Sequence, residues 1–235
     1  MTDAAASSLP DDAPDMATFD PAELDVAARY KLLIGGIVPR PIAVVGTVDG
    51  FGRTNLAPYS FFNGVGSDPM LLLFCPANQP SGKEKDSLRN AKPVIEGGTG
   101  MFVVNVATES MAREISAASE PLPFGESELD MAGLRWTPGS RVVAPRLIDA
   151  PVAFECHTTQ VIRSGADRPN AGNIVIGEVV MVHVRKDLVN DRHHIDADGL
   201  RAIGRMGGSS YATTRERFDV PRGKPALDTP DPTPG

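Results

Sequence analysis

Residues 38–90 decide how this chain is interpreted. They include VPRPIAVVGTVDG (38–50), NLAPYSFFNGVGSDP (55–69), LLLFC (71–75) and GKEKDSLRN (82–90). Arginine and lysine supply cationic donors, while serine, threonine and asparagine supply hydroxyls and amides. Proline, tyrosine and phenylalanine supply apolar faces. These groups suit a ligand that joins a phosphate to a flat conjugated ring, because the anion needs donors and the ring needs apolar walls.

The same stretch has the pattern of a β-hairpin. Residues 42–48 are mostly β-branched or apolar and are followed by Asp49-Gly50, which indicates a strand and then a turn. Residues 53–57 are the expected returning strand. Pro58 has no N–H to donate, so we expect regular pairing to end there. A turn over residues 57–60 would then expose backbone N–H groups to a ligand.

The segments PRPIA, T.D..G, NLAPYSFFN, DP and KDS..N, in this order, resemble the flavin reductase-like family of FMN-binding split-barrel proteins. Three later pieces, FVVN (102–105), GEVV (177–180) and GRMGGSSY (204–211), fit the same family in the same order. The resemblance runs from about Tyr30 to Arg217, and NLAPYSFFN and KDS are its most specific parts. The family usually has threonine where this chain has Ser87, so the hydroxyl is retained.

The resemblance implies a mainly β fold, an antiparallel split β-barrel with a few peripheral helices. It also implies a homodimer with one FMN per subunit near the dimer interface, and NADH or NADPH as electron donor. No side chain is expected to be catalytic, because the flavin carries the chemistry and the protein supplies orientation and electrostatics. The absence of a GxSxG motif agrees with this interpretation.

The candidate cofactor residues divide between the phosphate and the ring. A phosphate needs several donors and a cation, which favours Ser60, Lys85 and Ser87, and the resemblance supports them. Arg89, one helical turn from Lys85, could assist them. The remaining candidates would surround the ring, partly through their backbone, or belong to the glycine-containing segment near the C-terminus. The full set is Arg40, Pro41, Ile42, Thr47, Asn55, Ala57, Pro58, Tyr59, Ser60, Asn63, Lys85, Ser87, Arg205 and Tyr211.

Considered without the family motifs, the same residues fit plainer roles. The lysine and arginine side chains fit a solvated surface, the asparagines fit turns, and the aromatic residues fit a core. Spacing alone leaves these alternatives open. The paired His193-His194 near Asp191 and Asp196 lacks the spacing of a known zinc motif, so a solvated loop and no metal site are expected there.

The rest of the chain predicts strands joined by short helices and loops. Helices are expected over residues 21–33, over residues 86–90 with Asp86 as cap, and over residues 109–118. A loop with a short helix is expected over residues 120–136, a turn over 196–201, and a glycine-containing loop over 204–214. The expected strands are 70–74, 101–107, 151–162 and 173–185.

We expect one folded domain flanked by two tails. Residues 1–19 are rich in Ala, Ser, Asp and Pro and predict a disordered tail, because they offer little apolar surface to bury. Residues 20–217 form the predicted flavin reductase-like domain. Residues 218–235 form a Pro-rich C-terminal tail.

Composition limits the class of protein. The chain has 235 residues, enough for one large domain, and its net charge of −7 argues against nonspecific nucleic-acid binding. Cys75 and Cys156 lie in apolar runs and read as buried, reduced thiols. No apolar run reaches the ~20 residues of a membrane span, and the acidic N-terminus does not resemble a secretory signal. The sequence therefore predicts a cytoplasmic protein that does not bind membranes.

The functional prediction is an oxidoreductase of the flavin reductase type that transfers hydride from NADH or NADPH to flavin. Two alternatives remain at this point. One is a non-catalytic flavin-binding redox protein. The other is a flavin-dependent oxygenase or dehydrogenase with an organic substrate.

Overall fold

The computed structural model describes residues 13–230. The chain divides into two compact units, whose described parts are residues 13–37 and 38–230. In the first unit, residues 13–19 form neither helix nor strand, and helix α1 spans Val26–Gly36. The predicted helix over 21–33 therefore begins too early. Its start is set by Asp25, whose carboxylate accepts a hydrogen bond from the Ala28 N–H at 2.7 Å.

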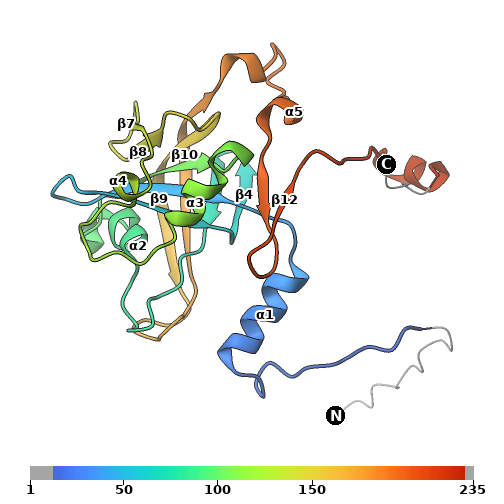
Figure 1. The fold of residues 1–235 in the computed structure, drawn as a ribbon, viewed down its shortest axis with the longest axis horizontal. Coiled ribbons are helices and arrows are strands. Elements are labelled where there is room, and N and C mark those ends of the chain that lie inside the picture. Colours follow the sequence, from blue (N-terminus) through green and yellow to red (C-terminus); the bar gives the residue numbers. More distant parts are fainter. Residues whose placement is uncertain (1–12, 231–235) are drawn as a thin grey trace. The chain divides into compact units, whose positions relative to one another are not determined.

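The second unit is built on a seven-stranded sheet in which every neighbouring pair is antiparallel (Figure 1). The sheet order is β3-β2-β6-β9-β10-β5-β4, so β3 and β4 are its two edges. The mainly β, antiparallel fold that the sequence predicted is confirmed. The strands are β2 (Ala43–Val48), β3 (Thr54–Tyr59), β4 (Phe62–Ser67), β5 (Met70–Phe74), β6 (Met101–Val106), β9 (Val152–Arg163) and β10 (Asn173–Val184).

Strand β3 does not end at Pro58, which corrects the predicted turn over residues 57–60. It continues to Tyr59, and Pro58 pairs with Val44 of β2. The Leu56 N–H points away from β2 and donates to Glu128 Oε2 at 2.9 Å. Pro58 lies two residues after Leu56 on the same strand, so its backbone nitrogen also faces the open edge. Proline therefore removes no hydrogen bond between β3 and β2.

Two smaller sheets accompany the large one. Strands β7 (Trp136–Pro138) and β8 (Pro145–Leu147) form a pair. Strands β1 (Arg40–Pro41), β11 (Ile203–Arg205) and β12 (Tyr211–Thr213) form the other sheet. The predicted loop over residues 204–214 is thus largely a hairpin, because Ile203 is buried in the core and Tyr211 packs against the same cluster.

Short helices connect the strands. Helix α2 begins at Asp86 with Lys85 as its N-cap residue, so the expected cap by the Asp86 side chain was wrong. The expected turn over 196–201 contains a short helix whose N-cap is Asp196. The remaining α-helices are α2 (Asp86–Ala91), α3 (Ala112–Ala117), α4 (Glu128–Met131) and α5 (Ala197–Leu200). The 3₁₀ helices are η1 (Val94–Glu96), η2 (Glu109–Met111), η3 (Lys186–Leu188) and η4 (Lys224–Asp228).

The predicted tails are only partly described. Residues 1–12 and 231–235 lie outside the described part of the chain. Within the C-terminal tail, η4 adds a short 3₁₀ helix that the Pro-rich composition did not predict.

The core of the second unit lies on both faces of the large sheet. One buried cluster includes Tyr59, Phe74 and Phe102, whose rings are in contact, with centroid distances of 5.2 and 5.1 Å. Both cysteines are free thiols, as the sequence predicted. Cys156 is buried in this cluster, but Cys75 is only half-buried, which corrects the predicted burial of that residue. Gly177 of β10 is required here, since a Cβ atom would lie 2.4 Å from the Phe102 ring.

A buried carboxylate ties the β7–β8 connection to the large sheet. Glu155 of β9 is fully buried, and its oxygens accept the N–H groups of Ser140 (2.7 Å), Arg141 (2.6 Å) and Val142 (3.0 Å). The same carboxylate bonds to His183 Nε2 on β10. Burial alone would raise the pKa of Glu155, but these hydrogen bonds outweigh it and lower that pKa to about 2.

Candidate functional site

A cleft lies at the open edge of β3, where the helices gather. Helices α2, α3 and α4 all contact β3 (Figure 1). The cleft has a volume of about 400 Å³, within the range of small-molecule sites. Six of the predicted cofactor residues line it, namely Asn55, Ala57, Pro58, Tyr59, Lys85 and Ser87. The other lining residues are Gln79, Pro80, Asp86, Ala118, Ser119, Glu120, Pro121, Leu122 and Glu128.

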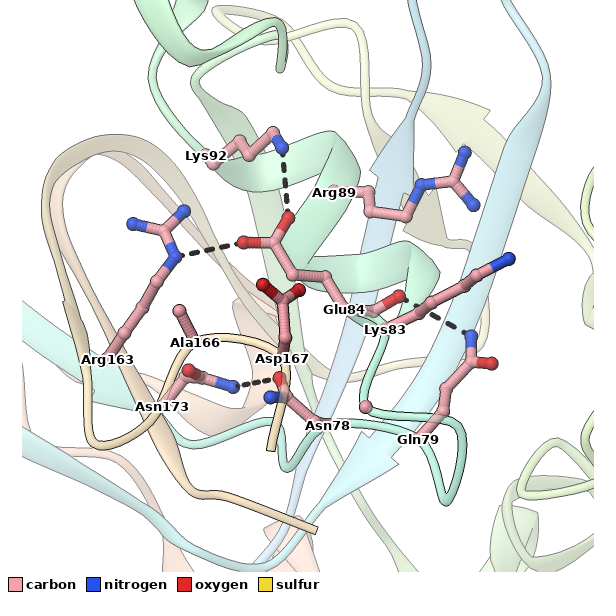
Figure 2. A pocket seen from close by; sticks show the side chains of 11 residues that line it. Asn78, Gln79, Lys83, Glu84, Arg89, Lys92, Arg163, Ala166, Asp167 and Asn173 are labelled. Carbon is pink, nitrogen blue, oxygen red and sulfur yellow. Dashed lines mark hydrogen bonds and ion pairs between the residues drawn. The ribbon is translucent and has the colours of Figure 1, made fainter. Parts of the chain in front are cut away.

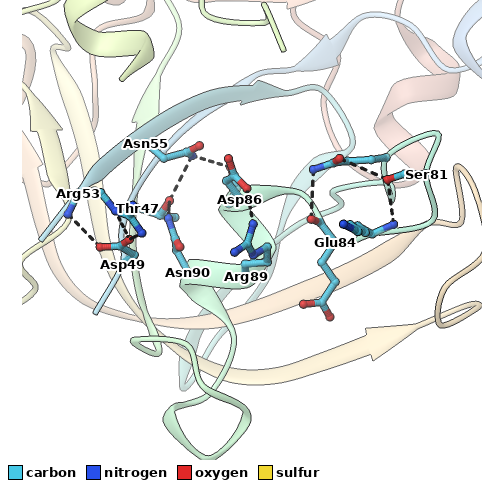
Figure 3. A network of polar contacts seen from close by, with 12 residues as sticks. Thr47, Asp49, Arg53, Asn55, Ser81, Glu84, Asp86, Arg89 and Asn90 are labelled. Atoms are coloured by element: carbon cyan, nitrogen blue, oxygen red, sulfur yellow. Dashed lines mark hydrogen bonds and ion pairs between the residues drawn. The ribbon is translucent and has the colours of Figure 1, made fainter. Parts of the chain in front are cut away.

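The polar side of this cleft is rigid because its groups hydrogen-bond to one another. Asn55 Nδ2 donates to Thr47 Oγ1 at 3.2 Å and to Ser87 Oγ at 3.0 Å, and Asn90 Nδ2 donates to Thr47 Oγ1 at 3.2 Å (Figure 3). All four side chains are buried. Thr47 itself therefore lies behind the cleft and orients Asn55. The network fixes Asn55 and Ser87 before any ligand arrives.

Burial raises the pKa of three ionisable side chains of the cleft, Tyr59, Asp86 and Glu128. It raises the pKa of Tyr59, against an opposing hydrogen bond from Ser87. It raises the pKa of Asp86 against the charge of Arg89. It raises the pKa of Glu128 as well, even though Glu128 accepts the Leu56 N–H. Each shift has desolvation as its main cause.

Lys85 is the cationic group of the cleft. Its side chain is exposed, and among the described residues its ammonium has no hydrogen-bond or ion-pair partner. The preceding residue, Glu84, is anchored, because its carboxylate binds Lys92 Nζ at 2.9 Å and Arg163 Nε at 2.9 Å (Figure 2). The position of Lys85 is therefore fixed while its charge remains available to an anion.

Glu84 also lines a second cavity, of about 480 Å³ (Figure 2). Its polar groups largely satisfy one another. Asn78 Nδ2 donates to the carbonyls of Gly165 and Arg168, and Asn173 Nδ2 donates to Asn78 Oδ1. These hydrogen bonds connect residues 76–84 to the β9–β10 hairpin, so we assign the cavity a structural role.

The predicted residues near the small sheet form a separate group. Arg40 is buried, and its guanidinium donates to Ser60 Oγ at 3.1 Å and to the Met206 carbonyl at 3.0 Å. Arg40 also pairs in register with Arg205, whose guanidinium lies 4.6 Å from the centre of the Tyr211 ring. These residues do not line the cleft described above.

Three further candidates have other positions. Pro41 pairs with Gly204 on β11, and Ile42 is buried in the core. Asn63 is exposed on β4, where its side-chain oxygen accepts the Gly64 N–H. The assignment of all these residues to the cofactor stays a prediction.

Sequence reasoning missed Glu128 and residues 118–122 as parts of the cleft. The chain offered only an indirect signal, an acidic and Pro-rich excursion between two core elements. For the described residues 13–230, no cluster of His, Cys, Asp or Glu could hold a metal ion. Over the same range, no helix is long and apolar enough to cross a bilayer.

Comparison with known proteins assigns the chain to a family. Residues 35–199 match the flavin reductase like domain. The chain belongs to the flavin reductase-like family. A curated relative, an uncharacterized protein of Deinococcus radiodurans, is 39% identical over 212 residues, covering 87% of this chain and 88% of the relative.

Solved structures agree with this assignment. Nitrilotriacetate monooxygenase component B from Bacillus cereus is 35% identical with a TM-score of 0.81, over 88% of this chain and all of that one. The 2-nitrobenzoate 2-nitroreductase of Pseudomonas fluorescens is 30% identical with a TM-score of 0.76, over 88% and 97% of the two chains. A split-barrel protein of Shewanella frigidimarina, 21% identical with a TM-score of 0.73 over 86% and 96%, shows the fold alone. The fold is thus a split barrel, and family membership supports a flavin-binding redox role.

Proposed function

We propose that this protein is a flavin reductase that binds FMN in the cleft at the edge of β3 and uses NADH or NADPH to reduce it. The observation that carries the proposal is the convergence on that cleft of Asn55, Ser87 and Lys85 from the two most specific family motifs. These motifs are distant in the sequence, and the contact of α2 with β3 brings them together.

The lining of the cleft fits a flavin. Pro58, Tyr59 and Leu122 supply apolar surface for a ring, and the exposed ammonium of Lys85 supplies the charge for a phosphate. Ser87 adds a hydroxyl that Asn55 holds in place. When bound, FMN would supply the hydride chemistry, and the chain would orient the ring and exclude water.

The donor would need no separate dinucleotide fold, because a nicotinamide could stack on the ring. In this proposal the protein acts as a homodimer. Support comes from β4, an edge strand of the large sheet whose residues 63–67 are exposed, and from α1, which has no buried residue.

The similarity to a nitroreductase favours a second candidate function. In that case the flavin would stay bound and deliver electrons to an organic substrate such as a nitroarene. The similarity to a monooxygenase component supports a different fate for the electrons, transfer of reduced flavin to an oxygenase. Either fate needs the same reduced flavin first.

The visible absorption spectrum tests the proposal directly. We expect protein incubated with FMN to retain a flavin spectrum after desalting, and NADH or NADPH to bleach it without oxygen. Turnover that rises with added free flavin would support the reductase, whereas turnover that needs a nitroarene would support the second candidate. Bound flavin that neither nicotinamide bleaches would contradict hydride transfer and leave a binding protein.

A further inference from the structure

We propose that Phe124 is a latch that holds residues 119–127 as a closed wall of the flavin cleft, and that it sets the rate at which FMN leaves. This inference rests on the proposed function and adds a residue that controls flavin retention. We call residues 119–127 the wall loop. Ser119, Glu120, Pro121 and Leu122 of this loop line the cleft, so a movement of the loop would loosen the hold on a flavin bound there.

The ends of the wall loop are fastened to regular structure. At its start, the Ser119 and Glu120 N–H groups bond to the carbonyls of Ser116 and Ala117. At its end, Ser127 Oγ lies 3.4 Å from Thr54 Oγ1, and the adjacent Glu128 accepts the N–H of Leu56 on β3. The middle of the loop has a different kind of attachment.

That attachment is a pair of cation–π contacts to one ring. The guanidinium carbon of Arg89 lies 3.8 Å from the centre of the Phe124 ring, and that of Arg53 lies 4.6 Å from it. Carboxylates orient both cations, since Asp86 binds Arg89 at 3.2 Å and Asp49 binds Arg53 at 2.7 Å (Figure 3). The ring is nonetheless partly solvent-exposed. Contacts of this kind at an exposed site are weak enough to open and close.

The local backbone is shaped for this contact. The Glu126 N–H bonds to the Pro123 carbonyl at 3.0 Å, which places Phe124 and Gly125 at the centre of a turn. Gly125 has φ of +93°, and a Cβ atom there would lie 3.0 Å from Arg53 Nη1. Glycine therefore permits both the turn and the close approach of Arg53.

The latch connects the loop to the helix that carries the phosphate candidates. Arg89 lies on α2, which also contains Ser87 and begins next to Lys85. Arg53 lies just before β3, which carries Asn55 and Tyr59. One aromatic ring thus joins the wall loop to both of the elements that supply the cleft.

The test compares FMN release from wild type, Phe124→Ala, Phe124→Leu and Phe51→Ala. Phe51 is the matched control, because its ring also contacts Arg53 (5.4 Å) but lies outside the wall loop. FMN-loaded proteins are desalted at timed intervals and the retained flavin is measured. We expect release about tenfold faster in Phe124→Ala, an intermediate rate in Phe124→Leu, and the wild-type rate in Phe51→Ala.

A second measurement reports on the loop without flavin. Glutamyl endopeptidase can cut after Glu126 in the wall loop, whereas the bond after Glu120 resists it because proline follows. We expect flavin-free Phe124→Ala to be cut there several times faster than wild type and Phe51→Ala. Equal cutting rates together with equal FMN release would overturn the latch. If wild type held no FMN, the proposed function would fail, and the cutting rates would still decide whether Phe124 holds the loop.

Discussion

At the scale of single residues, Lys85 and Lys83 are two neighbouring lysines with different surroundings. Lys85 lines the cleft beside Ser87, whereas Lys83 lines the second cavity. Both lie on a surface of a protein with a net charge of −7, so their local placement matters more than the overall charge. If Lys85 binds a phosphate, its contribution to ligand affinity should be present for a phosphate-bearing flavin and absent for a flavin without phosphate.

We expect Lys85→Ala to weaken FMN binding about tenfold or more and to leave riboflavin binding almost unchanged. A hydrogen bond to a charged group contributes ~1.5–3 kcal/mol, and 1.4 kcal/mol corresponds to tenfold in affinity. Riboflavin lacks the phosphate, so it isolates that contact. Titration calorimetry with both ligands measures the difference, and Lys83→Ala is the control. Equal losses for FMN and riboflavin would mean that Lys85 does not contact the phosphate.

Glu155 offers a residue-scale prediction about stability. Its pKa of about 2 in the folded protein lies below the value of about 4.3 expected in an unfolded chain. The lowered pKa means that its contribution to stability is present above about pH 5 and is lost as the pH falls towards 2. Glu155→Gln keeps the size but turns an NH₂ group towards backbone N–H donors. We expect it to lower the free energy of unfolding at pH 7 by ~3 kcal/mol.

Urea denaturation at pH 7 and at pH 4 checks this expectation. The variant should lose less stability than wild type between these two pH values, because it lacks the titrating group. Glu178→Gln, an exposed glutamate on the neighbouring strand β10, should behave as wild type. A variant with wild-type stability at pH 7 would show that the hydrogen bonds from the N–H groups of residues 140–142 to Glu155 contribute little to the free energy of unfolding.

At the scale of elements, the sequence predicted the strands well because their patterns are local. Strands β2, β5, β6, β9 and β10 follow from apolar runs bounded by Pro, Gly or Asp. The errors arose where tertiary contacts decide. Pro58 stays in β3 because the strand is an edge, and no local pattern reveals which strand lies at an edge. The hairpin of β11 and β12 forms because Ile203 is buried in the core. The glycine-rich sequence around Ile203 gives no local indication of this burial.

The candidate site was predictable in part for the same reason. Motif residues such as Asn55, Lys85 and Ser87 were found because the family motifs name them, and the structure brings these three to one cleft. Arg40 and Ser60 lie in the same stretch of sequence, but hydrogen-bond to each other away from that cleft. Glu128 was missed because its role depends on meeting the Leu56 N–H, 72 residues away in the chain.

At the scale of the whole molecule, the open question is what covers the edge strand β4. Exposed edge strands are ready to pair with another chain, and proteins usually protect them. In β4, Val65 is half exposed, and Met70 begins the neighbouring strand β5 with a similar exposure. A homodimer that uses this edge would bury both side chains.

We expect wild type to elute with a mass near twice 24.9 kDa in size-exclusion chromatography with light scattering, and Val65→Lys to elute near 24.9 kDa. An unpaired lysine charge is costly to bury in an interface, so it should separate the subunits. Val143→Lys is the control, because Val143 is also at least half exposed but lies between β7 and β8. A monomeric wild type would remove the dimer from the proposal. A dimeric Val65→Lys would instead place the interface away from β4, and FMN binding by that variant would show whether the cleft depends on the partner.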